Sequence, residues 1–333
     1  MVDRKNMVLR FLKGYRKTAV FAVTTQCNLK CIMCGMYKNP QAFMSLEKAK
    51  KVLELLLKNR FLIVYFTGGE PTLHPNINEV VRFANQLGLV TTLTTNGSSS
   101  KKVISDLRSS GLHLLSVSLD HWNSSICEKI RGVEGIKERQ EEIIRYSKKI
   151  GLKVYALVYL NPFLVEDGVE KIIKYVNHEL RVPIGFCYPT ESEINTFQLS
   201  GASYYKTKLN QKLREAVRVI LFLKKSGYKI MNAETYLEDV LYHYENMTPD
   251  SYCKGGELVV YVDWFGDVYP CFLKTKLFNL LEDGEARFLK NTKCNDCFIN
   301  CFREPSILPQ AFVSPTIFFK EVFYSHNVGF TII

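Results

Sequence analysis

The stretch TAVFAVTTQCNLKCIMC, from Thr18 to Cys34, decides the fold and holds the first candidate site. Its opening run, Thr18–Thr24, is apolar and β-branched, which predicts a buried strand. Cys27, Cys31 and Cys34 then follow on a loop, with three and two residues between neighbours. This spacing lets three thiolates meet on one small group and leaves a fourth metal position open. That arrangement suits a [4Fe–4S] cluster with one iron that the protein does not bind.

A zinc knuckle is the alternative for these three cysteines. Structural zinc needs four protein ligands. Neither a His nor a fourth Cys lies near the loop in the sequence. The iron–sulfur cluster is therefore the favoured interpretation of this loop.

Downstream, short β-rich runs alternate with helical stretches, which is typical of βαβ units and a parallel sheet. The expected strands are Thr18–Thr24, Ile63–Thr67, Val90–Thr95, Leu114–Leu119, Lys153–Tyr159 and Ile184–Tyr188. The expected helices are Leu46–Leu57, Ile77–Leu87, Val103–Ser109, Ile136–Ile150 and Val169–Val176. We therefore predict the α/β class, with a partial (β/α)6 TIM-type barrel over residues 18–200. Such folds build their sites at the C-terminal ends of the strands, where the cysteine loop falls.

Four further segments flank the predicted barrel. They are a basic N-terminal segment (1–17), a helical linker (201–250), a small Cys-rich hairpin and knuckle domain (251–310) and an aromatic-rich tail (311–333). Within the linker, the apolar spacing predicts a helix at Tyr204–Ser226. Within the Cys-rich domain, alternation over Glu257–Phe272 predicts a hairpin with its turn at Trp264–Asp267.

Composition indicates a globular protein, because 47% of the 333 residues are hydrophobic and 23% are charged. The net charge of +11 permits contact with anionic lipid, nucleic acid or phosphorylated substrates and selects none of them. We do not expect a nucleic-acid partner. No secretory signal pattern is found, and the cysteines cluster in metal-like spacings, so a reducing, cytoplasmic setting is expected.

The basic N-terminal segment allows two interpretations. It holds six basic side chains against one acid, Asp3, and interleaves them with apolar residues. This pattern fits a short amphipathic helix at a membrane surface. It fits equally a helix that caps the bottom of the barrel.

Small polar groups follow three of the predicted strands. The second strand ends in Gly68, Gly69, Glu70 and Pro71, the third in Thr94–Gly97, and the fourth in Ser116, Ser118 and Asp120. Paired glycines let a backbone approach a ligand closely, and side-chain hydroxyls and amides can bond ribose. Taken alone, the same residues are compatible with a tight turn and ordinary helix caps.

Together, the CxxxCxxC loop and these strand ends resemble the radical S-adenosylmethionine superfamily, through its GGEP, TNG and SxD elements. The resemblance implies that S-adenosylmethionine binds the open iron and is cleaved by one electron to a 5′-deoxyadenosyl radical. It also implies an electron donor of the flavodoxin or ferredoxin type. The implied cofactor contacts are Met33, Gly68, Gly69, Glu70, Asn96, Ser118, Asp120 and Arg131. Arg131 would meet the methionine carboxylate, to which a bidentate guanidinium is suited; a solvated surface arginine is the alternative.

A second metal site is predicted from the C-terminal cysteines. Cys253, twelve residues, Gly266, four residues and Cys271 resemble the opening of the SPASM and twitch pattern of auxiliary-cluster domains. Cys294, Cys297 and Cys301 follow. The five cysteines can fill one four-thiolate [4Fe–4S] cluster, or supply three bonds and leave an open iron; structural zinc is the alternative. Cys127 and Cys187 are expected to be buried as small apolar residues.

The sequence indicates less about the substrate than about the fold or the metal sites. The ending CNDCFINCFREP resembles the tail of the hopanoid adenosyltransferase group, which implies an apolar substrate, isoprenoid or lipid. Peptide or protein modification, the usual association of SPASM-like domains, is the second hypothesis, and a non-catalytic metal-site protein is the third. We expect a largely apolar site between the barrel and Cys253–Pro305. No catalytic residue is assigned; His121, beside Asp120, is the histidine to test.

Overall fold

The computed structural model describes residues 9–190, 210–245, 247–283, 287–311 and 314–324. Within them, one nine-stranded sheet has the order β6-β5-β4-β3-β2-β1-β7-β8-β9. Six parallel strands are β1 (Lys17–Thr24), β2 (Phe61–Gly68), β3 (Val90–Thr95), β4 (Leu114–Ser118), β5 (Lys153–Tyr159) and β6 (Ile184–Cys187). They match the predicted strands to within two residues at each end, and the partial barrel is confirmed.

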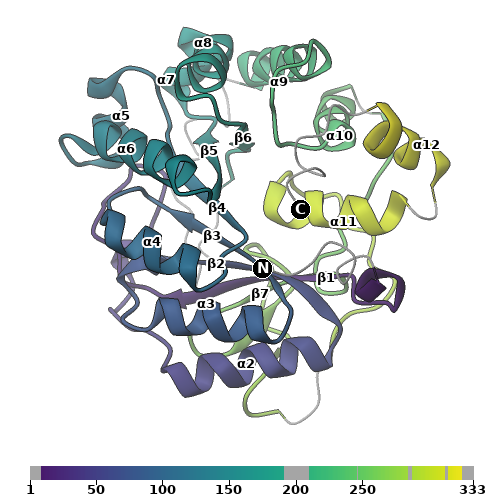
Figure 1. Cartoon of the computed structure of the whole chain (residues 1–333). Coiled ribbons are helices and arrows are strands. Elements are labelled where there is room, and N and C mark those ends of the chain that lie inside the picture. Colours follow the sequence, from purple (N-terminus) through teal and green to yellow (C-terminus); the bar gives the residue numbers. More distant parts are fainter. Residues whose placement is uncertain (1–8, 191–209, 246, 284–286, 312–313, 325–333) are drawn as a thin grey trace.

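Helices cover the outer face of this sheet. They are α2 (Leu46–Lys58), α3 (Ile77–Gln86), α4 (Lys101–Ser109), α5 (Ser124–Arg131), α6 (Ile136–Lys149), α7 (Pro162–Asp167), α8 (Val169–Lys174) and the π-helical turn η3 (Tyr175–Leu180). Figure 1 shows α2, α3, α4 and α6 along one side of the strands. The sequence did not predict α5 and α7, because eight and six residues are too few for a clear helical period.

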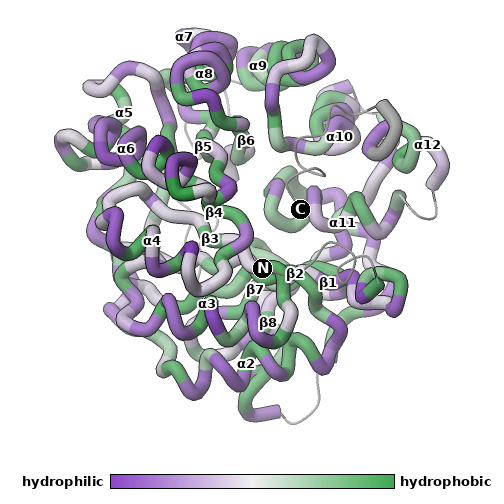
Figure 2. Tube along the Cα trace, viewed as in Figure 1, coloured by the Kyte–Doolittle hydropathy of each residue, from purple (hydrophilic) through white to green (hydrophobic). Residues whose placement is uncertain are grey.

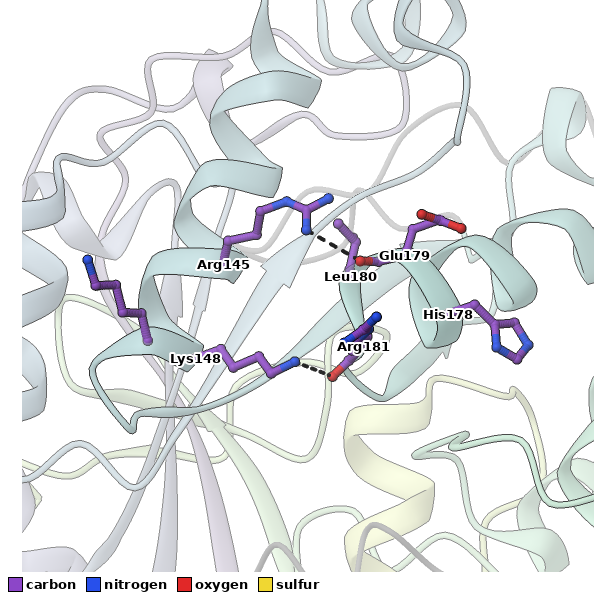
Figure 3. A pocket seen from close by; sticks show the side chains of 7 residues that line it. Arg145, Lys148, His178, Glu179, Leu180 and Arg181 are labelled. Carbon is purple, nitrogen blue, oxygen red and sulfur yellow. Dashed lines mark hydrogen bonds between the residues drawn. The ribbon is translucent and has the colours of Figure 1, made fainter.

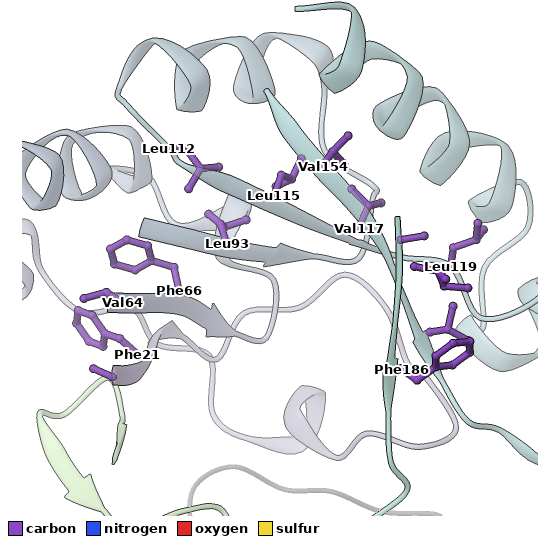
Figure 4. Close-up of a cluster of buried hydrophobic side chains, with 14 of the residues drawn as sticks. Phe21, Val64, Phe66, Leu93, Leu112, Leu115, Val117, Leu119, Val154 and Phe186 are labelled. Carbon is purple, nitrogen blue, oxygen red and sulfur yellow. The ribbon is translucent and has the colours of Figure 1, made fainter. Parts of the chain in front are cut away.

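Each strand of the barrel has one face packed against the helices in the hydrophobic core and one face toward the barrel interior. Phe21, Val64, Phe66, Leu93 and Leu115 point from the strands toward these helices and are fully buried (Figure 4). Burying each such side chain contributes about 1.5–3 kcal/mol. Figure 2 shows the matching pattern in the helices, where hydrophilic and hydrophobic residues alternate along α2 and α3. The remaining positions of the strands face the barrel interior, since successive side chains point to opposite faces.

The predicted C-terminal hairpin is present, but it belongs to the same sheet as the barrel. β7 (Val259–Val262) pairs antiparallel with β8 (Asp267–Tyr269), which pairs with β9 (Phe278–Asn279). Asp263 Oδ1 accepts bonds from the N–H groups of Phe265 and Asp267 and so holds the expected turn. β7 also pairs in parallel with β1. The hairpin therefore continues the barrel sheet past β1 and is not a separate layer.

The C-terminal half adds helices on the side opposite α2–α6. They are α9 (Asn210–Lys225), α10 (Glu234–Tyr244), α11 (Asn300–Ala311), α12 (Pro315–Phe318) and the π-helical turn η5 (Phe319–Tyr324). The predicted helix Tyr204–Ser226 is confirmed from Asn210 onward, and its first six residues lie outside the described part. Figure 1 shows α11 near α10 and α12. α11 passes through Pro305 and Pro309, where the predicted knuckle ended.

The described end of the N-terminal segment packs at the bottom of the barrel. Residues 9–12 are helical, and Arg10 Nη1 donates to the carbonyls of Leu87 and Gly88 just before β3. Arg60 Nη1 donates to the Lys13 carbonyl. The capping interpretation is thus the one that these residues show. Within the described residues, no helix has the length and apolarity that crossing a bilayer requires.

Candidate active site

The cysteine loop follows β1 and packs against the end of α5. The Ile32 N–H donates to the Ile130 carbonyl at 3.0 Å, and the Cys34 N–H donates to the Cys31 carbonyl at 3.1 Å. Cys31 is buried, whereas Cys27 and Cys34 are half-buried. Leu29, Cys127 and Ile136 form the apolar floor of the loop. Three thiols are thereby held at the C-terminal end of the strands, as predicted.

The chemistry of this loop suits iron–sulfur binding. Burial raises the pKa of the Cys27 and Cys34 thiols, so a bound cluster must displace their protons. Arg131 Nη1 lies 3.8 Å from Cys31 Sγ and brings a positive charge to offset thiolate charge. Among the described residues, no three His, Cys, Asp or Glu side chains are close enough together to hold a single ion.

The two glycines at the end of β2, Gly68 and Gly69, are required by contact with the cysteine loop. A Cβ at Gly68 would lie 2.2 Å from the Thr24 carbonyl oxygen, and one at Gly69 would lie 2.3 Å from that of Gln26. Their backbone also bonds the loop, because the Gly69 N–H donates to the Thr24 carbonyl and the Glu70 N–H to the Gln26 carbonyl. The glycine backbone was predicted to lie close to a ligand. In this structure it lies close to the start of the cysteine loop.

Glu70 and Asn96 link three loops to one another. The buried Glu70 carboxylate accepts bonds from the Thr72 and Thr95 hydroxyls and from the Asn96 N–H. Asn96 Nδ2 donates to Asn28 Oδ1 at 3.0 Å, within the cysteine loop. Asn28 was not singled out from the sequence, where it is simply a polar residue after Cys27. These bonds fix the loops; contacts of Glu70 and Asn96 with S-adenosylmethionine remain predictions.

Asp120 and Arg131 form a buried ion pair beside the loop, with Arg131 Nε 2.5 Å from Asp120 Oδ2. Asp120 Oδ1 also accepts the Tyr159 N–H at 2.9 Å, which joins the end of β4 to that of β5. Burial lowers the pKa of Arg131. The charges of Asp120 and Cys31 raise this pKa, and the net shift is upward. Arg131 therefore stays cationic. The solvated-surface alternative is wrong, while contact with a methionine carboxylate remains a prediction.

This ion pair gives a stability prediction. Asp120→Ala should lower the free energy of unfolding by about 3–5 kcal/mol, because it leaves the Arg131 charge buried without a partner. The double variant Asp120→Leu with Arg131→Met should lose less, since neither charge remains. Urea unfolding of the anaerobically reconstituted protein measures both changes.

An exposed pair supplies the control for this measurement. Glu166→Ala breaks the contact of Glu166 with Lys212, whose side chains are 44% and 48% exposed. Pairs of this kind contribute only about 0–1 kcal/mol. A single Asp120 variant that is no less stable than the Glu166 variant would show that the buried pair does not support the loop.

His121 and the two remaining cysteines have different positions. His121 is buried, its Nδ1 accepts the Asn123 N–H, and its ring stacks on Trp122 at 3.9 Å. It does not line the main cavity, so its role is to hold the turn after β4. Cys127 is buried, as predicted. The prediction for Cys187 is wrong, because Cys187 is half-buried and lines the cavity.

The main cavity occupies the barrel interior and has a volume of about 770 Å³. Met33, Cys34 and Ser118 line one end, beside the cysteine loop, and Phe272 and residues of α11 line one side. Its wall is mostly apolar and aromatic; the charged side chains on it are Arg16, Arg131 and Glu304. The site expected between the barrel and Cys253–Pro305 is therefore present as a cavity with an apolar wall.

A few polar groups in this cavity were not predicted. Tyr65 and Tyr155 project into it from β2 and β5, and burial raises the pKa of both. Glu304 Oε1 accepts the Ala233 N–H at 2.7 Å, and burial raises the pKa of Glu304 to about 7. No motif marks Tyr65 or Tyr155, and Glu304, although it lies in the ending CNDCFINCFREP, was given no role from the sequence; the three reach the cavity from elements distant in the sequence.

The five C-terminal cysteines gather at the start of α11. Cys253 and Cys294 exchange two backbone hydrogen bonds, and Cys271, Cys297 and Cys301 pack in the same apolar cluster. All five carry free thiols. The fully buried Arg303 donates to the Cys297 carbonyl and to Asp239. It lies in the ending CNDCFINCFREP, but nothing in that stretch indicates that its arginine is buried. The structure thus groups the predicted ligands of the second cluster; the cluster itself, bound by four of them or by three with one open iron, stays a prediction.

A second cavity, of about 590 Å³, lies outside the barrel between α6 and η3. In Figure 3, Arg145 and Lys148 reach main-chain carbonyls at the end of η3. Arg145 Nη1 donates to the Glu179 carbonyl and Lys148 Nζ to the Arg181 carbonyl. Basic side chains at a helix C-terminus satisfy its last carbonyls, so we assign this group a structural role.

Comparison with known proteins agrees with the fold and the loop. Residues 21–176 match the Radical SAM superfamily. The chain is 25% identical over 291 residues to the AdoMet-dependent heme synthase of Methanosarcina barkeri, across 81% of each chain. It is 29% identical over 161 residues to the antilisterial bacteriocin subtilosin biosynthesis protein AlbA of Bacillus subtilis, across 46% of this chain and 36% of AlbA.

Solved structures show the same fold. SuiB of Streptococcus suis bound to S-adenosylmethionine superposes with a TM-score of 0.64 at 18% identity, over 84% of this chain and 68% of SuiB. A structure of SuiB bound to the precursor peptide SuiA superposes with a TM-score of 0.60.

A parallel barrel with three cysteines after β1, together with these matches, defines a radical S-adenosylmethionine enzyme. The part of the chain that carries the superfamily match runs from β1 to η3. Its cofactors are a [4Fe–4S] cluster and S-adenosylmethionine. The hypothesis of a non-catalytic metal-site protein is therefore wrong.

Proposed function

We propose that this enzyme modifies a substrate with a large apolar body, isoprenoid or lipid, inside the barrel. The observation that carries the proposal is the cavity, because it begins at Met33 and Cys34 and continues between apolar and aromatic walls. When bound, the cluster and S-adenosylmethionine supply a 5′-deoxyadenosyl radical. Such a radical attacks C–H or C=C bonds that have no polar handle, so the substrate needs none.

The wall of the cavity favours a hydrocarbon on energetic grounds. Transfer of an apolar group from water to this wall is favourable by about 0.8 kcal/mol of free energy for each methylene. A peptide would bring a polar N–H and C=O at every residue, and each one left without a partner would cost about 1–3 kcal/mol. Polar side chains are present on the wall, among them Tyr65, Tyr155 and Glu304, but they are spread between apolar residues and do not follow the regular N–H and C=O pattern of a peptide.

The residues around the loop receive roles in this proposal. Cys27, Cys31 and Cys34 hold the cluster. Gly68, Gly69, Glu70, Asn96, Ser118 and Asp120 position S-adenosylmethionine, and Met33 lies beside its adenine. Arg131, held cationic by Asp120, offsets negative charge at the methionine carboxylate and the cluster thiolates.

The setting of the reaction is part of the same proposal. The enzyme acts in the cytoplasm, where its thiols stay reduced, and takes electrons from a donor of the flavodoxin or ferredoxin type. An auxiliary [4Fe–4S] cluster at the C-terminal cysteines completes the SPASM-like part. Besides capping the barrel, the basic N-terminal segment provides contact with a membrane surface, from which an apolar substrate would be drawn.

Peptide modification is the second candidate, and the comparisons favour it. AlbA is named for the biosynthesis of a bacteriocin, and SuiB is known with a precursor peptide. A relative aligned over most of both chains is named a heme synthase. A tetrapyrrole is also large and mostly apolar, so it falls within the apolar class and serves as a separate arm of the test.

Substrate-stimulated cleavage of S-adenosylmethionine separates these candidates. The protein is reconstituted anaerobically, reduced, and offered a lipid extract, an iron tetrapyrrole or a peptide fraction, while S-adenosylmethionine-derived products are followed by chromatography. We expect the lipid extract to raise product formation well above the substrate-free rate. Stimulation by peptides alone would overturn the apolar proposal.

A further inference from the structure

The main cavity runs the whole length of the barrel. At one end, its lining includes Thr18, Leu62, Val90 and Leu114, the first or second residues of β1 to β4. At the other end, it includes Ser118, Tyr159 and Cys187, the last residues of β4, β5 and β6. At about 3.3 Å per residue, strands of this size make the cavity about 15–20 Å long.

The hollow interior differs from that of a closed eight-stranded (β/α) barrel. Side chains normally fill such barrels in layers, so that the interior is a core and not a pore. Here α11 lies along the open side of the barrel, with Cys301 and Glu304 toward one end and Ile307 and Leu308 further along. The inward positions of β3 carry only Val90, Thr92 and Thr94. These small side chains leave space along the barrel axis.

The end of the cavity far from the cysteine loop is bordered by the N-terminal segment. Phe11, Leu12 and Arg16 line it there. Leu12 lies at the rim, because it lines the cavity and is also 63% exposed. Arg10 anchors this segment to the carbonyls of Leu87 and Gly88. We call this end, formed by Phe11, Leu12 and Arg16, the lower mouth.

We propose that the substrate is a linear hydrocarbon chain that runs lengthwise through the barrel, with its reacting end below Met33 and Cys34 and its tail at the lower mouth. This inference rests on the proposed function and adds a length, an orientation and an exit to it. A compact substrate could occupy only the end near the cysteine loop and would gain nothing from the apolar residues at the strand starts. For a linear chain, each added methylene raises the binding affinity until the chain reaches Leu12.

Chain-length dependence tests this directly. Each added methylene is worth about 0.8 kcal/mol, which is about a four-fold gain in affinity. Hexanol, decanol and tetradecanol are dialysed to equilibrium against the reconstituted holoenzyme with S-adenosylmethionine and no reductant. We expect affinity to rise with length and to level off once the chain spans the cavity.

Two variants locate the tail. Leu12→Asp puts a charge at the lower mouth and should weaken tetradecanol binding about ten-fold or more while leaving hexanol unchanged. Leu9→Asp is the matched control, because Leu9 lies on the same short helix, is 53% exposed and does not line the cavity. Leu114→Trp, which narrows the lower half, should move the length limit to a shorter chain. Leu12 is exposed, so its variant keeps the test valid even where the Leu114 variant fails to fold.

The outcomes separate this inference from the proposed function. If alkanols bind with no length dependence, or if Leu12→Asp and Leu9→Asp affect tetradecanol alike, the through-barrel placement is wrong while an apolar substrate stands. If no alkanol binds, the apolar proposal itself fails. Loss of long-chain binding in Leu12→Asp alone supports the placement.

Discussion

Replacing Cys27, Cys31 and Cys34 together by alanine is expected to abolish reductive cleavage of S-adenosylmethionine. The three thiols lie on one loop at the strand ends, and Arg131 offsets charge at Cys31. Without them no iron can be held with an open position there. Chromatography of the reduced, reconstituted protein should show no 5′-deoxyadenosine above background, and the iron content should fall by about four per chain.

Cys127→Ala is the matched control for the triple variant. Cys127 is buried against the same loop, and its thiol donates to Gln140. Its loss should leave both iron content and cleavage near the wild-type values. Retained cleavage in the triple variant would contradict the assignment of the loop as the radical-generating site.

The second large effect concerns the C-terminal cysteines. With two [4Fe–4S] clusters, the reconstituted chain should hold about eight iron atoms, and replacing Cys294, Cys297 and Cys301 by alanine should reduce this to about four. The reason is that Cys253, Cys271, Cys294, Cys297 and Cys301 pack in one cluster, so losing three leaves two thiolates, fewer than a four-thiolate cluster or a cluster with one open iron needs. Iron and sulfide assays with metal analysis by mass spectrometry measure the change.

Cys187→Ala controls for the loss of any cysteine near this group. Cys187 lines the cavity on β6 and is not an expected ligand, so its variant should retain about eight iron atoms. About four iron atoms and one zinc in the wild-type protein would refute the second cluster and assign the cysteines a structural role.

The barrel could be predicted from the sequence because its signals are local. Each of β1 to β6 is a short β-rich run, and helices such as α2 and α6 show apolar spacing over three or more turns. The pairing of β7 with β1 had no such signal. It joins residues 18–21 to 259–262, and a hairpin sequence looks the same whether its outer edge is free or paired.

Some features of the candidate site could also be predicted from local signals, and others could not. Cys27, Cys31 and Cys34 lie within one short motif, and Gly68 to Glu70 occupy one turn. Their role in binding the loop, however, appears only when β1 and β2 lie side by side. An apolar site between the barrel and Cys253–Pro305 could be predicted, but its polar groups could not, because Tyr65, Tyr155, Cys187 and Glu304 meet there from separate elements. The ion pair between Asp120 and Arg131 could not be predicted either. From the sequence, Arg131 could have been a solvated surface residue, and only the fold shows that Asp120 holds its guanidinium in a buried position.

The physical character of the cavity, more than any motif, favours a hydrocarbon over a peptide. The relatives with peptide-related names share the fold at low identity, and a fold is compatible with many substrates. What this chain itself contributes is an apolar wall that extends from the cysteine loop to Leu12. The account therefore depends on whether a hydrocarbon carbon meets the radical.

That contact can be measured by running the lipid-stimulated reaction with an extract from cells grown in deuterated medium. Mass spectrometry then reads the adenosyl group of every product and of the remaining S-adenosylmethionine. The account predicts deuterium there, either as a single atom in 5′-deoxyadenosine or S-adenosylmethionine or as an adduct that carries the deuterated hydrocarbon. Products that stay free of deuterium with the lipid extract, but gain it from a deuterated peptide fraction, would contradict the account.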